Sequence, residues 1–432
     1  MKKLTAAIVG LGARGFVYAD IMKQLSDQIE IVACADINPL CRKLFCEQFN
    51  ISPENCYESD EALLAQGKLA DLMVVATQDR QHAGIAIAAM KLGYDILCEK
   101  PVSPFADECL AVEQTAQETG RRVIVCHVLR YSLFFLTIKH IIESGEIGEV
   151  VALEMTEKVG YWHQAHSYVR GNWRSSIESS PMILAKSCHD MDLILWLTNK
   201  HCISVNSIGN LKHFKRSNAP AGASEHCTVN CPEYETCPYS VEKSYLRKAR
   251  EEHYFLWPTS VVTHLGTLED LQNQLAEGPY GRCVYHCDND VVDHQHVNLL
   301  LEDDVTASFT MSAFTSGTGR RIHVMGTKGD IIGELNEAKV VVTKFGSESV
   351  TLDTTIKEFE QYGHGGGDLG VVKETIAVLN GNEKNTYSIT SIENSIESHL
   401  TALAAEESRL HGGDTVRLDD YVKEVKSAKH KW

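Results

Sequence analysis

The sequence predicts an α/β protein of two domains, and three observations lead to this fold class. Short apolar runs alternate with helical patterns from residue 5 to residue 128, the pattern of a doubly wound parallel sheet. A glycine-rich turn directly follows the first of these runs. From about residue 150, short strand patterns are joined by Gly, Asp and Asn turns. We expect one domain over 1–127 and a second over 128–432, the latter α+β with a large, mostly antiparallel open sheet and a Cys-rich insertion at about 217–290.

The first domain begins with the pattern of a dinucleotide-binding unit. An apolar run over 5–9 leads into Gly10-Leu11-Gly12-Ala13-Arg14-Gly15, a helical pattern covers 16–25, and a strand over 29–35 ends at Asp36. This order and spacing predict a Rossmann domain whose turn holds backbone N–H groups against a pyrophosphate. We expect Asp36 to accept hydrogen bonds from ribose hydroxyls, and its charge favours NAD over NADP. The alternative is a glycine turn beside a solvated aspartate.

Lys100 stands where a buried strand should end. The run over 95–100 is apolar until Glu99-Lys100-Pro101, and proline cannot continue a sheet ladder. A charge at this place is costly unless something faces it, and ligands of open α/β sheets bind beyond the carboxyl ends of the strands. We therefore interpret Lys100 as a site residue. The alternative is a lysine whose ammonium group extends to water.

The composition argues against some classes of partner. The 432-residue chain has 41 Lys and Arg against 58 Asp and Glu, and this net charge of −17 argues against nucleic acid or an anionic membrane. No window approaches 18 consecutive apolar residues, and glycines soon interrupt the apolar run after Met1-Lys2-Lys3 that superficially resembles a signal peptide. The 14 cysteines are mostly single in apolar segments, which fits a reducing compartment. We therefore expect a cytoplasmic protein.

Taken together, the motifs resemble the Gfo/Idh/MocA family of NAD(P)-dependent oxidoreductases, which act mainly on sugars, sugar derivatives and cyclitols. The resemblance covers nearly the whole chain. Besides the glycine turn and Asp36, it rests on Ala76-Thr77 with His82, Cys98-Glu99-Lys100-Pro101, Leu129-Arg130-Tyr131, Gly145-Glu146-Ile147-Gly148, Trp173-Arg174, His189-Asp190-Met191-Asp192 and Gly326-Thr327-Lys328-Gly329. It implies a Rossmann domain followed by an open-sheet α/β domain, commonly assembled into homodimers or homotetramers.

The resemblance also implies roles for the matching residues. NAD would exchange a hydride with a secondary alcohol, Lys100 would clamp the hydroxyl and reach the nicotinamide ribose, and His189 would act as the general base. For His189 the alternative is a helix histidine that caps a neighbour. Asp192 is assigned to the substrate. The residues assigned to the cofactor are Gly10, Gly12, Ala13, Arg14, Gly15, Asp36, Thr77, Gln78, His82, Glu99, Lys100, Arg130, Trp173 and Arg174.

One position departs from the usual pattern of the family. Many members carry an aspartate four residues before this histidine, on the same helical face, where this chain has Ala185. Lys186 follows and would bring a second cation close to His189, lowering its pKa and keeping it neutral. Lys186 is therefore a candidate catalytic residue that would suit an anionic substrate such as a sugar acid. Alternatively, it pairs with Asp190 or Asp192 on its own helix.

Aromatic and polar side chains are dense over residues 160–174. Aromatic faces with hydrogen-bonding groups suit a carbohydrate ring, and an interface between subunits favours the same residue types. His364, before three glycines and Asp368, is a candidate to cap the pocket. The expected substrate-binding residues are Tyr161, His163, His166, Arg170, Asp192 and His364.

A compact group of thiols lies outside these motifs. Cys227, Cys231 and Cys237 follow His226, and Cys283 and Cys287 form a second pair. Structural zinc, free buried thiols and a disulfide all remain open, because the spacing is not that of a standard zinc finger and the fourth ligand is unassigned.

Three functions are compatible with the sequence. The first is an NAD-dependent dehydrogenase of a sugar, sugar acid or cyclitol. The second is a redox-neutral hydrolase or lyase, in which transient oxidation acidifies a neighbouring C–H, elimination follows and the hydride returns; Tyr161, His163 or His166 would then take the proton. The third is a catalytically silent sugar or NAD sensor, against which Lys100 and His189 argue.

Overall fold

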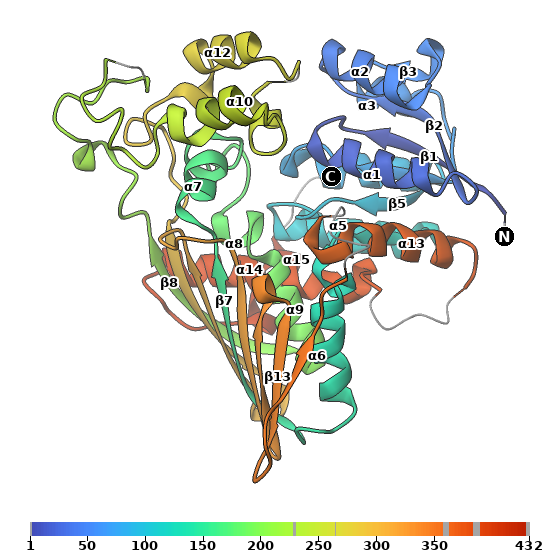
Figure 1. Cartoon of the computed structure of the whole chain (residues 1–432). Coiled ribbons are helices and arrows are strands. Elements are labelled where there is room, and N and C mark those ends of the chain that lie inside the picture. Colours follow the sequence, from blue (N-terminus) through green and yellow to red (C-terminus); the bar gives the residue numbers. More distant parts are fainter. Residues whose placement is uncertain (1, 228–229, 264, 357–362, 383–388, 429–432) are drawn as a thin grey trace.

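The structure, a computed structural model, describes residues 2–227, 230–263, 265–356, 363–382 and 389–428 (Figure 1). The N-terminal part forms a six-stranded parallel sheet in the order β3-β2-β1-β4-β5-β6. Its strands are β1 (Leu4–Val9), β2 (Ile29–Ala35), β3 (Cys56–Tyr57), β4 (Leu72–Val75), β5 (Asp95–Cys98) and β6 (Val123–Val125). The predicted Rossmann sheet is confirmed. Its strands are apolar throughout because helices cover both faces.

The C-terminal part contains a nine-stranded sheet in the order β14-β13-β12-β11-β7-β10-β9-β8-β15. Strands β7 and β10 are parallel and the other neighbours are antiparallel, so the predicted mostly antiparallel sheet is also confirmed. The strands are β7 (Val150–Lys158), β8 (Cys202–Asn210), β9 (His294–Leu301), β10 (Thr306–Ser312), β11 (Gly319–Gly326), β12 (Gly329–Glu334), β13 (Lys339–Lys344), β14 (Val350–Asp353) and β15 (Val416–Arg417).

Helices cover the parallel sheet on both sides and one face of the large sheet (Figure 1). Those of the N-terminal half are α1 (Ala13–Gln24), α2 (Pro39–Phe49), α3 (Asp60–Leu64), α4 (His82–Lys91), α5 (Ala106–Thr119) and α6 (Leu133–Glu143). Those that follow are α7 (Tyr161–His163), α8 (Met182–Ala185), α9 (Cys188–Thr198), α10 (Arg247–Glu252), α11 (Thr259–Val262), α12 (Leu268–Glu277), α13 (Gly367–Leu379), α14 (Ile392–Leu410) and α15 (Leu418–Ser427).

Helix α13 belongs to the core of the N-terminal sheet although it lies near the end of the chain. Its apolar side chains, including Leu369, Val372 and Ile376, share a buried cluster with Ile8 and Tyr18. The division of the chain between residues 127 and 128 stays a prediction. Helix α13 comes from the second part of the chain but packs on the first.

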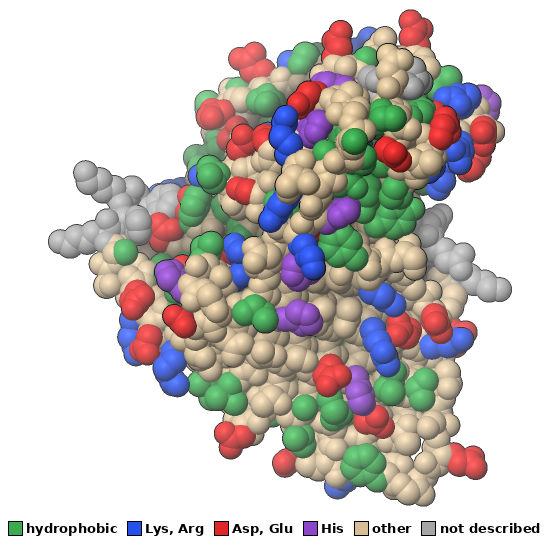
Figure 2. Space-filling view, turned by 90° about the vertical axis from the view of Figure 1, so that its left-hand side faces the viewer, with side chains coloured by type: hydrophobic (Ala, Val, Ile, Leu, Met, Phe, Trp, Pro, Cys, Tyr) green, Lys and Arg blue, Asp and Glu red, His purple; other side chains and the backbone are tan. Residues whose placement is uncertain are grey.

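The outer face of the large sheet is not covered by the described residues. Along β9, buried side chains alternate with exposed ones, so one face packs on helices and the other is open. On this open face, Leu300 of β9 and Ile208 of the neighbouring strand β8 are exposed. On the surface shown in Figure 2, acidic and basic side chains are interspersed and neither sign forms a continuous patch.

No helix among the described residues is long and apolar enough to cross a membrane.

The helical pattern over 184–197 is interrupted in the structure. Helix α8 ends at Ala185 and α9 begins at Cys188. The carbonyl oxygen of Ala185 accepts a hydrogen bond from the Lys100 ammonium group, 2.7 Å away. In a continuous helix this carbonyl would accept from the N–H of residue 189. The break therefore leaves this carbonyl free to accept from Lys100.

Candidate functional site

The glycine loop has the shape that a dinucleotide requires. Gly10 has φ of +90°, and a Cβ there would lie 2.4 Å from the Ala76 carbonyl oxygen. A Cβ on Gly15 would lie 2.2 Å from the Gly10 carbonyl oxygen. Gly12 is the N-cap of α1, has no side-chain cap and faces open space within 4 Å of the position of a Cβ. The N–H groups at the start of α1, which include those of Ala13 and Arg14, therefore remain free for an anion.

Two more predicted cofactor residues lie around this loop. Asp36 follows β2, and its carboxylate accepts hydrogen bonds from the backbone N–H groups of Leu11 (2.6 Å) and Asn38 (2.7 Å). It is therefore fixed beside the loop, where an adenosine ribose would lie. The hydroxyl of Thr77, after β4, is buried without a hydrogen-bond partner, and Gln78 is the next residue. An unpaired buried hydroxyl is costly, so a bound cofactor would supply what Thr77 lacks.

His82 connects two loops of the site. Its Nδ1 lies 2.7 Å from the carbonyl oxygen of Pro101, and its Nε2 lies 3.1 Å from that of Thr77. Both ring nitrogens thus contact protein carbonyls. The structure therefore places His82 as a support for the loops after β4 and β5, with no nitrogen left for the cofactor.

Arg14, Glu99 and His364 belong to one chain of charges. The guanidinium of Arg14 contacts Glu99 at 2.5 Å and Asp368 at 2.7 Å, and Nδ1 of His364 lies 3.1 Å from Asp368. Burial raises the pKa of Glu99, but Arg14 and Lys100 outweigh it and lower the pKa below its usual value. These contacts join the glycine loop to the start of α13.

Lys100 is a cation that is bound by a carbonyl. It lies two residues beyond the end of β5, and its ammonium group donates to the Ala185 carbonyl oxygen. Among the described residues it makes no ion pair within 4.0 Å. An ammonium group with donors to spare at a strand end suits developing negative charge on a substrate oxygen.

The second lysine, Lys186, is paired with a strand residue. Its ammonium group lies 3.2 Å from Glu157 on β7, so the alternative pairing with Asp190 or Asp192 is wrong. Arg320 on β11 contacts both Glu157 (2.9 Å) and Asp190 (2.6 Å). Burial lowers the pKa of Lys186, and the positive charges of Arg320 and Lys100 lower it further. The carboxylate of Glu157 raises it but does not outweigh these effects.

His189 lies in the first turn of α9 and is almost fully buried. Its Nδ1 has no hydrogen-bond partner, and its ring centre lies 5.6 Å from that of His127 and 6.4 Å from that of His364. Burial holds the pKa of His189 well below its usual value, and the charge of Lys100 lowers it further. The lowered pKa expected for His189 is therefore present, but its main electrostatic cause is Lys100 and not Lys186; its role as a base stays a prediction.

The aromatic segment divides between two environments. Burial lowers the pKa of His163, and the positive charges of Lys186 and Lys100 lower it further. Tyr161 instead packs against Tyr239, and His166 contacts the Tyr245 hydroxyl at 2.8 Å.

Arg170, the last residue of the π-helix η4 (Gln164–Arg170), also faces the insertion. Its Nε and Nη2 donate to the carbonyl oxygens of Arg282 and Tyr239. The structure therefore leaves His163 within the electrostatic influence of the lysines, and it places Tyr161, His166 and Arg170 against the insertion.

Several residues near the site were missed from the sequence. Trp257 of the insertion is 41% exposed, and its ring centre lies 5.0 Å from that of His163. Asp79, in the loop after β4, accepts from the Trp173 indole (3.0 Å) and from the hydroxyls of Ser179 and Ser180. Asp79 was detectable from its position, because it closely follows Ala76-Thr77 in the strand-end motif. Trp257 carried no such signal.

Trp173 and Arg174 were expected at the cofactor. The structure instead places Trp173 on Asp79 and pairs Arg174 with Asp288 (3.0 Å) and Glu178 (2.7 Å). Trp173 thus connects the second domain to the loop of Thr77, whereas Arg174 acts at the surface.

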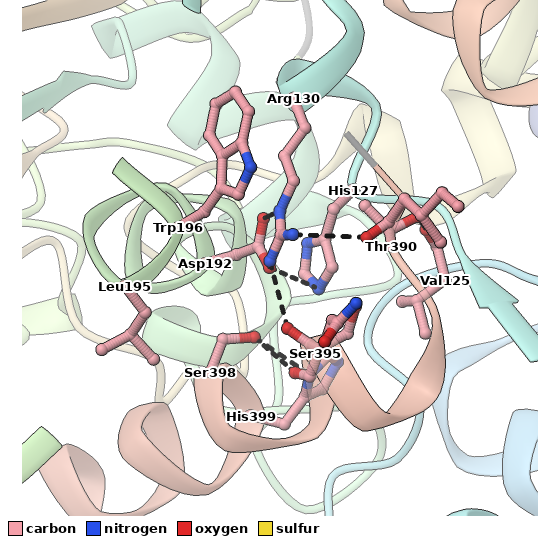
Figure 3. A network of polar contacts seen from close by, with 12 residues as sticks. Val125, His127, Arg130, Asp192, Leu195, Trp196, Thr390, Ser395, Ser398 and His399 are labelled. Atoms are coloured by element: carbon pink, nitrogen blue, oxygen red, sulfur yellow. Dashed lines mark hydrogen bonds and ion pairs between the residues drawn. The ribbon is translucent and has the colours of Figure 1, made fainter. Parts of the chain in front are cut away.

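Arg130 and Asp192 bind one another (Figure 3). Arg130, in the turn after β6, donates to both carboxylate oxygens of Asp192 on α9, at 2.7 and 2.5 Å. Its Nη2 also donates to the carbonyl oxygen of Asn394, and Nε2 of His127 lies 3.7 Å from Asp192. Both side chains are buried. They therefore join the turn after β6 to helix α9, and the structure leaves neither free for cofactor or substrate.

The expected zinc site at Cys227, Cys231 and Cys237 is not supported. Among the described residues, the group of His, Cys, Asp or Glu side chains that brings ligand atoms within 4.8 Å of one another is Cys34, Cys46 and Cys56. All 14 cysteines are free thiols. A tetrahedral zinc site needs its ligands closer together than Cys227, Cys231 and Cys237 place them.

This fold and site define an NAD-dependent oxidoreductase with a Rossmann domain and a mixed-sheet second domain. Family models agree with that class: "Oxidoreductase family, NAD-binding Rossmann fold" matches residues 4–127, and "Oxidoreductase family, C-terminal alpha/beta domain" matches 139–418. The chain belongs to the Gfo/Idh/MocA family.

Curated relatives share a modest fraction of the sequence. A protein named as an oxidoreductase, YteT of Bacillus subtilis, is 24% identical over 413 residues, covering 88% of this chain and 92% of its own. Inositol 2-dehydrogenase of Salmonella typhimurium is 24% identical over 198 residues, covering 46% of this chain. The chain spans about 55% of that enzyme's length.

Solved structures share the fold. An inositol dehydrogenase homolog of Azotobacter vinelandii complexed with NAD+ has a TM-score of 0.69 at 16% identity and covers 96% of this chain and 97% of its own. The same homolog with NADH and myo-inositol gives 0.65 at 15% identity, covering 96% and 98%. An oxidoreductase of Agrobacterium radiobacter in complex with NAD+, L-tartaric acid and magnesium gives 0.67 at 17% identity, covering 97% and 99%.

The buried Arg130–Asp192 pair yields a prediction about stability. Asp192→Asn leaves the Arg130 guanidinium buried without its counter-charge, so we expect the free energy of unfolding to fall by about 3–5 kcal/mol in denaturant titrations. Asp420→Asn is the control, because the Asp420 side chain is 60% exposed and its ion pairs contribute at most about 1 kcal/mol. Equal losses in the two variants would contradict this role of the pair.

The open space at Gly12 yields a prediction about NAD. Gly12→Ala adds a methyl group that meets no protein atom within 4 Å but occupies the approach of a pyrophosphate. We expect an unchanged melting temperature and a Kd for NAD raised at least about tenfold, or about 1.4 kcal/mol, in fluorescence titrations. Gly84→Ala, on α4 and also facing open space, should leave both unchanged. An unaltered Kd in Gly12→Ala would place the cofactor elsewhere.

Proposed function

We propose that the protein transfers a hydride between NAD and a secondary alcohol of a sugar, sugar acid or cyclitol. The observation that carries this proposal is that Lys100, a cation without a carboxylate partner among the described residues, binds the carbonyl of Ala185, four residues before the buried His189 whose pKa its charge lowers. Removal of a hydride from an alcohol requires a base for the proton and a positive charge near the oxygen. The names of the inositol dehydrogenase relatives support the substrate class.

In the proposed mechanism Lys100 keeps its hydrogen bond to the Ala185 carbonyl and uses a second N–H to bind the reacting hydroxyl. A ring nitrogen of His189 takes the hydroxyl proton, and the charge of Lys100 stabilises the oxygen as negative charge develops. When bound, NAD supplies the hydride acceptor. The positive charge that forms on His189 lies near His127 and Lys100, which favours prompt release of the proton.

The surroundings support a polar ring as substrate. His163 and the half-exposed Trp257 offer aromatic faces against which the C–H face of a sugar or cyclitol would stack. Lys186 is neutralised by Glu157, so Lys100 is the cation that would bind a carboxylate of a sugar acid. We also infer a homodimer or homotetramer, because apolar side chains on the outer face of the large sheet are exposed.

The test is turnover on a panel of inositols, uronic acids, sialic-acid derivatives and glycosides with the NAD-loaded protein. NADH absorbance and released products are followed together, and NADH should accumulate in proportion to the substrate oxidised. Substrate cleavage with no net NADH would favour the redox-neutral reaction. No turnover of any panel member, despite NAD binding, would count against the proposal as a whole.

Replacement of Lys100 should impair catalysis far more than folding. In Lys100→Met the ammonium group is lost while the length of the side chain is nearly kept, so we expect kcat/KM to fall about 10²–10³-fold. The Kd for NAD should change much less. Lys91→Met, at the exposed end of α4, should behave like the natural protein. Full activity in Lys100→Met would sink the assigned role and favour a sensor.

The buried His189 predicts the acid limb of the pH profile. The neutral imidazole is the active base, and burial and Lys100 hold its pKa well below 6.5 in the folded protein. The value of kcat/KM should therefore stay level as the pH falls through 6.5 and decline only at lower pH. In Lys100→Met the acid limb of the residual activity should move to higher pH, because one of the two main causes of the lowered pKa of His189 is removed. A limb that does not move would contradict the proximity of the two groups.

A further inference from the structure

Three cysteines of the N-terminal sheet and its helices bring their sulfur atoms together. Cys34 lies on β2, Cys46 on α2 and Cys56 on β3 (Figure 1), and the three Sγ atoms all lie within 4.8 Å of one another. The sulfurs of Cys34 and Cys46 are 3.7 Å apart. Cys34 and Cys56 are partners in the parallel pairing of β2 with β3. Three different elements thus direct one thiol each to the same point.

The sulfur separations match those of a site for a single metal ion. Thiolates that bind one ion at about 2.3 Å lie about 3.8–4.0 Å from one another. The separation of 3.7 Å between Cys34 and Cys46 is already this short, and the other two exceed it by at most about 1 Å. Cys46 and Cys56 are both partly exposed, so an ion can reach them from solvent. The thiols therefore already stand near the spacing that one ion needs.

The number of ligands favours a soft ion that accepts three sulfurs. In the part of the chain that the structure describes, no further His, Cys, Asp or Glu brings a ligand atom into this group. The carboxylate of the nearby Asp36 is instead held by the backbone N–H groups of Leu11 and Asn38. Structural zinc takes four protein ligands, whereas Cu(I) is selected by thiolates and accepts three of them.

The surroundings of the thiols are apolar. Cys34 belongs to the buried cluster that contains Ile8 and Phe45, and Cys46 and Cys56 pack against this cluster. A water molecule would find few polar partners there, so it is a poor fourth ligand for zinc. The guanidinium of Arg42 on α2 supplies positive charge beside the thiols, which offsets part of the negative charge of three thiolates.

The protonation of the thiols argues against an oxidative role. Burial raises the pKa of Cys34 well above its usual value and that of Cys46 to about 11. Disulfide formation needs a thiolate as the attacking group, so neutral thiols form a disulfide slowly. A metal ion instead displaces the protons when it binds.

We propose that Cys34, Cys46 and Cys56 bind one thiophilic metal ion of the Cu(I) class through their three sulfurs. Each thiol exchanges its proton for a bond to the ion, and the three protons pass to solvent, so neither sulfur nor metal changes its oxidation state. The ion would tie helix α2 and the two-residue edge strand β3 to β2, which ends directly before Asp36. This proposal does not depend on the substrate or on hydride transfer.

The experiment is a titration of the full-length protein, freed of metal and kept reduced under argon, with Cu(I) in competition with a coloured Cu(I) chelator. We expect the first Cu(I) per chain to be taken from the chelator, with release of about three protons. X-ray absorption of the loaded protein should show three sulfur neighbours. Bound Cu(I) should also protect Cys46 and Cys56 of the natural protein from alkylation by iodoacetamide, as mass spectrometry of its peptides would record.

Matched variants locate the ion. Cys46→Ala and Cys56→Ala each remove a partly exposed thiol, and we expect the Kd of the first Cu(I) to rise at least about tenfold in both. Cys41→Ala, on the same helix as Cys46 but outside the group, should bind Cu(I) like the natural protein. Cys231→Ala is the control for the thiols of the insertion. An unchanged melting temperature of the metal-free protein shows that a variant is folded, and the alkylation measurement needs no variant.

Three results would overturn the proposal. A first Cu(I) that Cys46→Ala and Cys56→Ala bind as tightly as the natural protein would place the ion at other thiols. Unchanged alkylation of Cys46 and Cys56 after loading would do the same. A disulfide within the group, or a four-coordinate zinc ion on it in protein isolated under reducing conditions, would contradict the three-sulfur site.

Discussion

The hydrogen bond from the Lys100 ammonium group to the Ala185 carbonyl is the interaction around which the site is built. It joins the end of the parallel sheet to the short helix α8, and it coincides with the interruption between α8 and α9. A carboxylate at position 185 would neutralise the ammonium group. A carbonyl oxygen orients it and leaves its charge available, which is the condition for stabilising a developing alkoxide.

The surrounding charges are arranged so that they do not cancel Lys100. Glu157 and Asp190 are held by Lys186 and Arg320, while Glu99 is held by Arg14. Each of these three buried carboxylates thus contacts at least one cation. His189 lies among these groups and keeps its neutral form because both burial and the nearby positive charge oppose protonation.

The sequence predicted the parts of the site that depend on local pattern. The glycine turn, Asp36 and Lys100 follow strand ends, and parallel strands bring such residues to one edge of the sheet. Contacts between segments that are far apart in the sequence could not be predicted from local pattern. Nothing local indicates that Lys186 reaches Glu157 on β7, that Asp192 meets Arg130, or that α13 completes the N-terminal core. Helices α2 and α6 were absent from the predicted elements, and the helix expected over 184–197 is two helices.

The insertion likewise depends on contacts between segments that are far apart in the sequence. The insertion has a buried apolar cluster of its own, and it contains the half-exposed Trp257 that packs on His163. Its cysteines were visible in the sequence, but their spacing along the chain left the ligand set open. The fold brings Cys283 to the same small cavity as Cys227, Cys231 and Cys237, and Arg170 borders it too. The guanidinium of Arg170 borders the same cavity and keeps one donor unused, and burying a donor without a partner costs free energy.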